Sequence, residues 1–275
     1  KRFHQDTHGI PGRNEENDQW GATLIAADFS EDGIDDLIVG SPNESIGEKQ
    51  QSGSITILYG SREGISSQKS TRIHQGSFGI QDSNEAFDRW GSVLTTGDFN
   101  GDSKIDLVIG APAEGSGTFL RTGAITIIPG TAGLLTSREA KTIHQDQIPS
   151  NLDISHADHW GDALGSVDVN GDGKTDLLVA SSAKSIGTQF DSGTITLLWG
   201  TKNGIVPENS NYLDQNISRI PDDNKSMDYW GRLGTSSELT LERPPLGLIT
   251  PAGINVVVMV ELPQTTNSSL AQYIV

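Results

Sequence analysis

Short runs of apolar, often β-branched residues alternate with turn-rich segments along this chain. Within residues 20–89 the runs that fit strands are LIAAD (24–28), DLIVG (36–40), SITILYG (54–60) and TRIHQ (71–75). Runs of this length, bounded by Gly, Asp, Asn, Ser and Pro, are typical of β-strands. No stretch carries a clear helical period of apolar positions. The pattern therefore predicts an all-β protein, and we name the strands of such a unit A to D.

The same pattern returns every seventy residues. Trp-Gly pairs stand at Trp20, Trp90, Trp160 and Trp230. The segment GSITILYG (53–60) recurs as GAITIIPG (123–130) and GTITLLWG (193–200). Short strands in groups of four, repeated about four times, indicate a β-propeller in which each repeat forms one radial blade.

We expect one propeller domain over residues 1–275, with blades at about 20–89, 90–159, 160–229 and 230–275. Residues 1–19 are expected to add an outer strand, KRFHQD, and a loop to a preceding or closing blade. The fourth blade is degenerate, and its predicted strands B, C and D are LGLITPA (246–252), INVVVMV (254–260) and SLAQYIV (269–275). Four blades could close a ring of their own or belong to a larger, seven-bladed propeller.

The charge of the chain excludes some partners. Thirty-six acidic against nineteen basic residues give a formal net charge of −17. This charge repels nucleic acid and anionic membrane surfaces, so neither is expected as a partner. The longest apolar run, around Val256 to Val260, is too short for membrane insertion. Cysteine is absent, which excludes a disulfide framework and a thiol nucleophile.

Much of the negative charge falls in the turns between strands A and B, which we call the A–B turns: DFSEDGIDD (28–36), DFNGDSKID (98–106) and DVNGDGKTD (168–176). Each turn has oxygen-bearing side chains at its first, third, fifth and ninth positions and a backbone carbonyl at its seventh. The predicted ligands are Asp28, Ser30, Asp32, Ile34 and Asp36; Asp98, Asn100, Asp102, Lys104 and Asp106; and Asp168, Asn170, Asp172, Lys174 and Asp176. An all-oxygen set suits Ca²⁺ better than Mg²⁺. We therefore expect three calcium sites.

The A–B turns have two alternatives to this calcium geometry. An EF-hand is excluded, because its loop needs an acid at position 12 and a following helix. Position 12 here is Val39, Ile109 or Val179, each inside strand B. Solvated turns without an ion are the second alternative, since Asp, Asn and Gly favour turns anyway. The second site is expected to be the weakest, because Ser103 replaces a glycine where a positive φ would favour Gly.

The opposite face of the propeller is where we expect a ligand. Antiparallel strands place the A–B and C–D connections on one face and the longer B–C and D–A connections on the other. Long loops on a rigid scaffold usually carry the binding residues. Aromatic, Arg and His side chains there could stack on sugars or anchor a protein: Phe78, Phe87, Arg89, Phe119, Arg121, His156, His159, Phe190 and Tyr229. The alternative is that each of them packs its own loop.

An aromatic-Gly pair, then an acidic turn, then Gly-Ala-Pro resembles the FG-GAP repeat, most closely in DFNGDSKIDLVIGAP (98–112). That repeat builds the propeller of integrin alpha chains and of many bacterial surface proteins. Here every FG is WG, and GAP becomes GSP at 40–42 and ASS at 180–182. The resemblance implies calcium in the A–B turns and a role in adhesion or ligand binding.

These features predict a calcium-stabilised module, extracellular or on the cell surface, that binds a protein or glycan ligand. Neither HExxH nor GxSxG occurs in the chain, and we expect no catalysis by this domain itself. Sites of this kind suit extracellular calcium concentrations. Two alternatives stay open: an accessory propeller of a larger secreted enzyme, and a purely structural surface protein.

Overall fold

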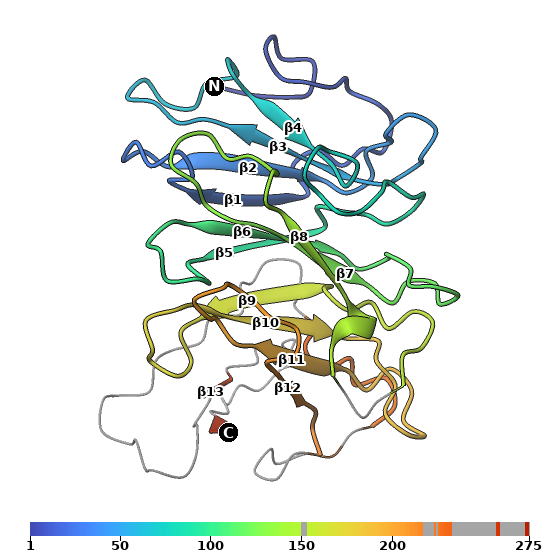
Figure 1. The fold of residues 1–275 in the computed structure, drawn as a ribbon. Helices are drawn as coiled ribbons and strands as arrows, with labels where there is room; N and C mark the ends of the chain where they lie inside the picture. The colour runs from blue at the N-terminus through green and yellow to red at the C-terminus, as the bar shows by residue number, and fades with distance from the viewer. Residues whose placement is uncertain (150–152, 217–222, 224, 233–256, 259–272, 275) are drawn as a thin grey trace, which may run out of the picture.

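The computed structural model describes residues 1–149, 153–216, 223, 225–232, 257–258 and 273–274. These residues form three four-stranded antiparallel sheets, and the helical element among them is a short 3₁₀ turn, η1 (Gln145–Gln147). Figure 1 shows the sheets stacked one after another in chain order. The predicted all-β fold with four strands in a repeat is confirmed.

Each strand pairs with the next one along the chain. The first sheet contains β1 (Thr23–Ala27), β2 (Asp36–Ser41), β3 (Ser54–Leu58) and β4 (Thr71–Ile73). The second contains β5 (Val93–Gly97), β6 (Asp106–Ala111), β7 (Ala124–Ile128) and β8 (Lys141–His144). The third contains β9 (Ala163–Val167), β10 (Asp176–Ser181), β11 (Thr194–Leu198) and β12 (Ser210–Leu213). These are strands A to D of the three repeats.

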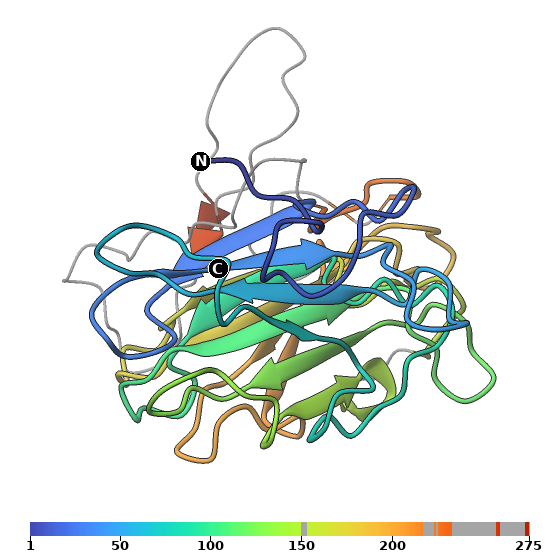
Figure 2. The same ribbon diagram turned by 90° about the horizontal axis from the view of Figure 1, so that it is seen from above.

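The sheets pack face to face, and their A strands are neighbours. β5 contacts β1 on one side and β9 on the other. The Thr95 hydroxyl of β5 hydrogen-bonds the Ser166 hydroxyl of β9 at 3.0 Å, and the Thr23 hydroxyl of β1 donates to the Gly91 carbonyl at 2.8 Å. Viewed from above, the successive sheets overlie one another (Figure 2). This is the arrangement of consecutive blades with strand A innermost.

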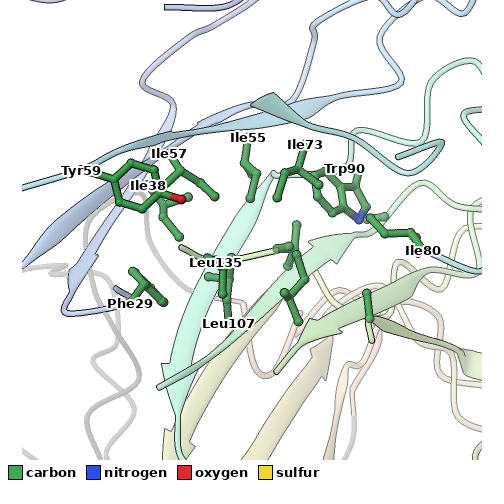
Figure 3. Close-up of a cluster of buried hydrophobic side chains, with 14 residues drawn as sticks. Phe29, Ile38, Ile55, Ile57, Tyr59, Ile73, Ile80, Trp90, Leu107 and Leu135 are labelled. Carbon is green, nitrogen blue, oxygen red and sulfur yellow. The ribbon is translucent and has the colours of Figure 1, made fainter. Parts of the chain in front are cut away.

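The hydrophobic core lies between the sheets. Figure 3 shows Ile38, Ile55 and Ile57 of the first sheet directed toward Leu107 of the second. Every residue of β3, β7 and β11 is buried, including the Thr at the centre of each strand, because strand C is covered on both faces. Each fully buried Ile or Leu side chain contributes about 1.5–3 kcal/mol relative to an exposed one.

The periodic tryptophans fill the junctions between sheets. Trp90 and Trp160 are 0% and 1% exposed. Their indole N–H groups donate to the hydroxyls of Thr126 (2.9 Å) and Thr196 (3.0 Å), each in strand C of the same repeat. A buried indole normally needs such a partner. The tryptophan therefore ties the start of strand A to the middle of its own sheet while packing against the preceding sheet.

The glycine that precedes each strand C is required by this tryptophan. A Cβ at Gly53 or at Gly123 would lie 2.0 Å from the carbonyl oxygen of Trp90 or Trp160. Both glycines also have a positive φ, +90° and +99°. Glycine is the amino acid that meets both conditions. The Gly of GSITILYG and its copies therefore allows the backbone of the tryptophan to approach closely.

The N-terminal segment and the fourth blade differ from the three regular repeats. Residues 1–6, predicted to form the outer strand KRFHQD, form no strand. Instead the segment packs on the first sheet, where Phe3 lies against the buried cluster of Ile10, Val39 and Leu58. The predicted strand B of the fourth blade lies outside the described residues. Within its predicted strands C and D, β13 (Val257–Val258) pairs antiparallel with β14 (Tyr273–Ile274). The number of blades stays a prediction.

Replacing Trp90 with Ala should lower the free energy of unfolding by about 3–5 kcal/mol, because it opens a cavity between the sheets and removes the buried hydrogen bond to the Thr126 hydroxyl. Trp20→Ala is the matched control, since Trp20 is only partly buried beside the first sheet, and it should cost less. Urea unfolding followed by circular dichroism measures both variants. Equal costs would contradict the role of the buried tryptophan as a wedge between sheets.

Candidate calcium turns and ligand-binding loops

The first aspartate of each A–B turn folds the turn around itself. The Asp28 carboxylate accepts hydrogen bonds from the backbone N–H groups of Asp32 (3.0 Å) and Gly33 (2.8 Å). The corresponding bonds in the second and third turns measure 2.7–3.1 Å. Asp is favoured in such turns because its short side chain can reach the backbone a few residues ahead. The three turns therefore share one conformation.

The ninth aspartate of each turn is buried at the start of strand B, and it links the A–B turn to the end of strand C. One carboxylate oxygen of Asp106 accepts from the backbone N–H of Phe99 in the turn (3.0 Å). The other accepts from Gly130, just beyond strand C (2.7 Å). Asp176 makes the equivalent pair of bonds, with Val169 and Gly200, and Asp36 accepts from Gly60 and from Ser30, one residue later in the turn. Burial raises the pKa of all three carboxyls, that of Asp106 to about 6.

The fifth aspartate is the exposed member of each turn. The hydrogen bond from the Lys174 backbone N–H lowers the pKa of Asp172, so this carboxylate is charged at neutral pH. The ammonium groups of Lys104 and Lys174 lie 3.4 and 3.5 Å from Asp102 and Asp172. The first turn has Ile34 at that position and so lacks this competing cation.

The predicted ligands are of the chemical type that binds calcium, but the carboxylates of a turn do not all lie close together. Carboxylate, amide, hydroxyl and carbonyl oxygens form the donor set that a hard cation prefers. Among the described residues, the three carboxylates of an A–B turn do not all lie within 4.8 Å of one another. The fifth aspartate also accepts a hydrogen bond from a backbone N–H, at 2.9 Å in each turn, but of the three aspartates it is the exposed one.

The sixth position of the turn behaves as expected. Gly33 and Gly173 have φ values of +84° and +85°, and Ser103 has +67°. A non-glycine residue in this left-handed region is strained by roughly 1–2 kcal/mol. At this position the second turn carries a strain that the first and third avoid, whereas the first turn carries it at its fourth position, where Glu31 has a φ of +57°.

On the opposite face, each D–A connection runs beside the B–C connection of its own repeat. We call these pairs of segments loop pair 1 (41–53 with 83–89), loop pair 2 (111–123 with 153–159) and loop pair 3 (181–193 with 225–229). Backbone hydrogen bonds join them at matching positions: Phe87 N–H to Gln50 O, Ala157 N–H to Leu120 O, and Met227 N–H to Phe190 O, at 2.8–2.9 Å. Side chains far apart in sequence are thereby brought together.

Most of the predicted ligand-binding residues lie on these loop pairs. In loop pair 2 the Phe119 and His156 rings have centroids 5.3 Å apart, and His156 Nδ1 accepts a hydrogen bond from the Leu120 N–H at 3.1 Å. In loop pair 3 the Tyr229 hydroxyl lies 3.4 Å from the Asp191 carboxylate. Loop pair 1 carries Phe87 and Arg89, and Arg121 lies in loop pair 2; all three are exposed.

His159 shows that neighbouring loop pairs are close together. Burial lowers its pKa first, and the charge of Arg121 in its own loop pair lowers it further. The charges of Arg89 in loop pair 1 and of Asp191 in loop pair 3 also act on it, in opposite directions. Hydrogen bonds join neighbouring loop pairs directly: the Ala113 N–H donates to the Asp88 carbonyl at 3.3 Å, and the Ser181 hydroxyl donates to the Asp158 carbonyl at 2.6 Å. The three loop pairs therefore form one continuous surface.

Phe78 lies apart from that surface, although it was predicted to be part of it. Its carbonyl accepts a hydrogen bond from the Ser137 hydroxyl, in the C–D connection of the second repeat, at 2.8 Å. Its side chain is 82% exposed. The early part of the D–A connection therefore packs against the outside of the next sheet before it reaches the loop pair.

Several residues of note were missed by the sequence analysis. Leu120 and Met227, 68% and 71% exposed, add apolar surface to the loop pairs. Asp18, Asp88 and Asp158 are buried behind those loops. A signal for the aspartates was present, since each stands two residues before a periodic tryptophan. The exposed Leu and Met had no such signal.

A hollow of about 540 Å³ lies beside the third A–B turn. It is lined by Asn170, Asp172, Lys174, Trp199, Gly200, Thr201, Lys202 and Asn209. The Trp199 indole N–H is held by Asn211 at 2.7 Å. This hollow opens on the face of the A–B turns, away from the loop pairs.

Stacked four-stranded sheets with an acidic turn after each first strand define a repeat protein of the β-propeller type. Residues 20–58, 90–128 and 160–198 match the FG-GAP repeat, and the chain therefore contains three FG-GAP repeats. Each match covers strands A to C of one sheet, so the family resemblance drawn from the sequence is confirmed. No helix in the described part of the chain is both long and apolar enough to cross a membrane.

Relatives of the chain include phospholipases and integrin alpha chains. It is 33% identical over 162 residues to phosphatidylinositol-glycan-specific phospholipase D of Rattus norvegicus, covering 58% of this chain and 18% of the relative. The Dictyostelium discoideum protein of the same name is 28% identical over 224 residues (77% and 22%). Integrin alpha-X of Mus musculus is 31% identical over 169 residues (60% and 13%). The chain thus spans less than a quarter of the length of these relatives.

Replacing Ser103 with Gly should raise the free energy of unfolding by about 0.5–1 kcal/mol, because relief of the left-handed strain exceeds the entropy that Gly adds to the unfolded chain. Ser103→Ala is the matched control: it removes the same hydroxyl but keeps a Cβ at a φ of +67°, so it should bring no such gain. Chemical denaturation in the presence of chelator measures both changes. A destabilised Ser103→Gly chain would contradict the strain assigned to the second turn.

Proposed function

We propose that the chain is a calcium-stabilised extracellular module that binds a protein or glycan ligand through its loop pairs and has no catalysis of its own. The observation that carries this proposal is the continuous surface of the three loop pairs, where exposed aromatic, aliphatic and Arg side chains are supported by backbone pairing. The FG-GAP repeats and the likeness to an integrin alpha chain support the same conclusion.

The loop-pair surface has the composition of a binding site. Leu120, Phe190 and Met227 are each about two-thirds exposed or more, in neighbouring loop pairs. Apolar side chains gathered in this way on a soluble surface usually mark a contact with another molecule. Arg89 and Arg121 lie beside them, and aromatic and Arg residues carry most of the energy of known interfaces. Because the loops are already held by hydrogen bonds, little ordering free energy opposes binding.

Calcium is proposed to stabilise the other face, in three sites. The ligands are the first, third, fifth, seventh and ninth residues of each A–B turn. An ion at each turn would neutralise carboxylates in a chain of formal charge −17 and would hold the link between strands A and B. Extracellular modules bind Ca²⁺ with dissociation constants of roughly 0.1–1 mM, which matches an exposed turn of this kind.

An accessory role in a larger secreted enzyme is the second candidate. It is favoured by the likeness to phosphatidylinositol-glycan-specific phospholipase D, of which the chain spans 18%. In that case the loop pairs would position a catalytic part outside this chain, or bind the surface on which its substrate lies. The sequence that flanks residues 1–275 in the full gene product separates the two candidates.

Removing calcium should lower the melting temperature, and Asp32→Asn should abolish about one third of the calcium-dependent gain in stability. The reason is that a site saturated 100-fold above its dissociation constant adds about 2.7 kcal/mol. Asp35→Asn is the matched control: it removes the same charge from the same turn at an exposed position outside the predicted ligand set. Thermal scans with calcium and with chelator measure the effect. A chain that melts at the same temperature in both would sink the calcium proposal.

Binding to an array of glycans and matrix proteins should weaken at least about tenfold in Phe190→Ser, a loss of about 1.4 kcal/mol. Phe78→Ser is the control, because Phe78 is as exposed but lies away from the loop pairs. Neither variant should change the melting temperature. Equal binding by both variants would place the ligand elsewhere, for example at the hollow beside Trp199. A blank array from folded, calcium-loaded protein would favour the accessory or structural role.

A further inference from the structure

A second group of carboxylates lies at the junction of the first two sheets, far from the A–B turns in the fold. Glu85 and Asp88, at the end of the D–A connection, meet Glu114, at the start of the B–C connection of the second repeat. One oxygen of each lies within 4.8 Å of the other two. Asp88 and Glu114 are 3% and 1% exposed, and Glu85 is exposed. Three like charges in such a place repel one another strongly unless something neutralises them.

The equivalent positions of the other repeats contain that neutralising charge. In the first repeat Arg72 Nη1 lies 2.7 Å from Glu44, the equivalent of Glu114. In the third repeat Lys184 replaces the glutamate, and its Nζ lies 2.6 Å from Asp158, the equivalent of Asp88.

The second repeat has neither cation. Thr142 stands where the first repeat has Arg72, and Glu114 stands where the third repeat has Lys184. Within the part of the chain that the structure describes, the three carboxylates form no ion pair with a Lys or Arg side chain. The junction is built like its two counterparts but lacks their positive group.

The buried side-chain amide of Gln75 indicates what takes the place of the missing positive charge. Gln75 is 1% exposed, and its Nε2 donates to Glu114 at 2.6 Å. The Oε1 atom of the same amide is buried without a hydrogen-bond donor. A buried carbonyl oxygen without a donor is costly, and a cation would satisfy it. The junction thus offers three carboxylates and an unpartnered carbonyl oxygen.

We propose that Glu85, Asp88, Glu114 and the side-chain carbonyl of Gln75 bind a divalent cation, Ca²⁺ in an extracellular setting, at the junction of the first and second blades. Ligands that are all oxygen select a hard cation. The exposed Glu85 provides the route of entry. The ion does for the second repeat what Arg72 and Lys184 do for the first and third. It also ties the loop that carries Phe87 and Arg89 to the next blade, and is separate from the three sites of the A–B turns.

Protons are the alternative to a metal ion. Burial raises the pKa of Asp88 to about 7 and that of Glu114 to about 9, with the neighbouring carboxylates adding to both shifts. A cluster that holds protons would bind no calcium of its own. The metal-bound and the protonated cluster therefore differ in the number of ions bound.

The test counts bound calcium by equilibrium dialysis of the 275-residue chain at about 1 mM free calcium. Glu114→Lys copies the third repeat and should bind one ion fewer than the unchanged chain. It should also melt at a higher temperature in chelator, because the ammonium takes the place of the ion. Glu114→Gln should lose one ion without that gain. Glu139→Lys, an exposed change of the same charge in the same repeat, should bind as many ions as the unchanged chain.

A background that carries Asp32→Asn, Asp102→Asn and Asp172→Asn separates this site from the A–B turns. One ion should remain in that background and disappear when Glu114→Gln is added. If the A–B turns bind no calcium at all, the unchanged chain should still bind one ion and the Glu114→Gln chain none. The proposal is overturned if Glu114→Gln, folded as judged by a cooperative melt, binds as many ions as the unchanged chain. It is overturned equally if Glu139→Lys loses an ion as Glu114→Lys does.

Discussion

The close packing of a tryptophan on a glycine backbone sets the positions of both faces of this protein. The peptide of Trp90 lies against Gly53 so closely that no Cβ fits between them, and the two residues form a parallel bridge. Gly193 and Trp230 form the same bridge. The contact holds the end of a D–A connection beside the B–C connection of its repeat. The indole of the same tryptophan fills the space between that sheet and the next one. The loop pairs are therefore a consequence of how consecutive sheets pack.

Electrostatics shape each repeat as strongly as packing does. At the A–B turns the first, fifth and ninth aspartates all turn oxygens toward backbone N–H groups, and of these three the fifth is the exposed one. At the sheet junctions the repeats differ: Arg72 or Lys184 provides the positive charge in two of them, and the second has three carboxylates and Gln75 instead. The backbone fold is thus the same in the three repeats, whereas the charged residues at the junctions differ, and the second junction is where an ion beyond those of the A–B turns is proposed.

The fold could be predicted from the sequence because its period is carried by residues with strong local preferences. Apolar runs, Trp-Gly pairs and Asp/Gly turns defined strands A to D, and the positive φ at Ser103 followed from the two glycines aligned with it. The outer strand at the N-terminus could not be judged in this way, because a strand also needs a partner. The carboxylate junction was missed for a related reason: its three members come from two connections and meet only through tertiary packing. The place of Phe78 beside Ser137 of the next repeat could not be predicted, because connection length says nothing about the path a loop takes.

The two faces of the blades differ in structure, and this difference explains why the macromolecular ligand is assigned to one of them. The A–B turns are short, alike in conformation and stabilised by their own aspartates, so they suit repeated ions. The loop pairs share a backbone frame but differ in side chains from repeat to repeat, with Phe87, Leu120 and Phe190 exposed on neighbouring pairs. A frame held by backbone hydrogen bonds tolerates such variation, because its geometry does not depend on those side chains. A cation at the junction of Glu85, Asp88 and Glu114 would extend this logic, since it would fix the relative position of two variable loops without restricting what they display.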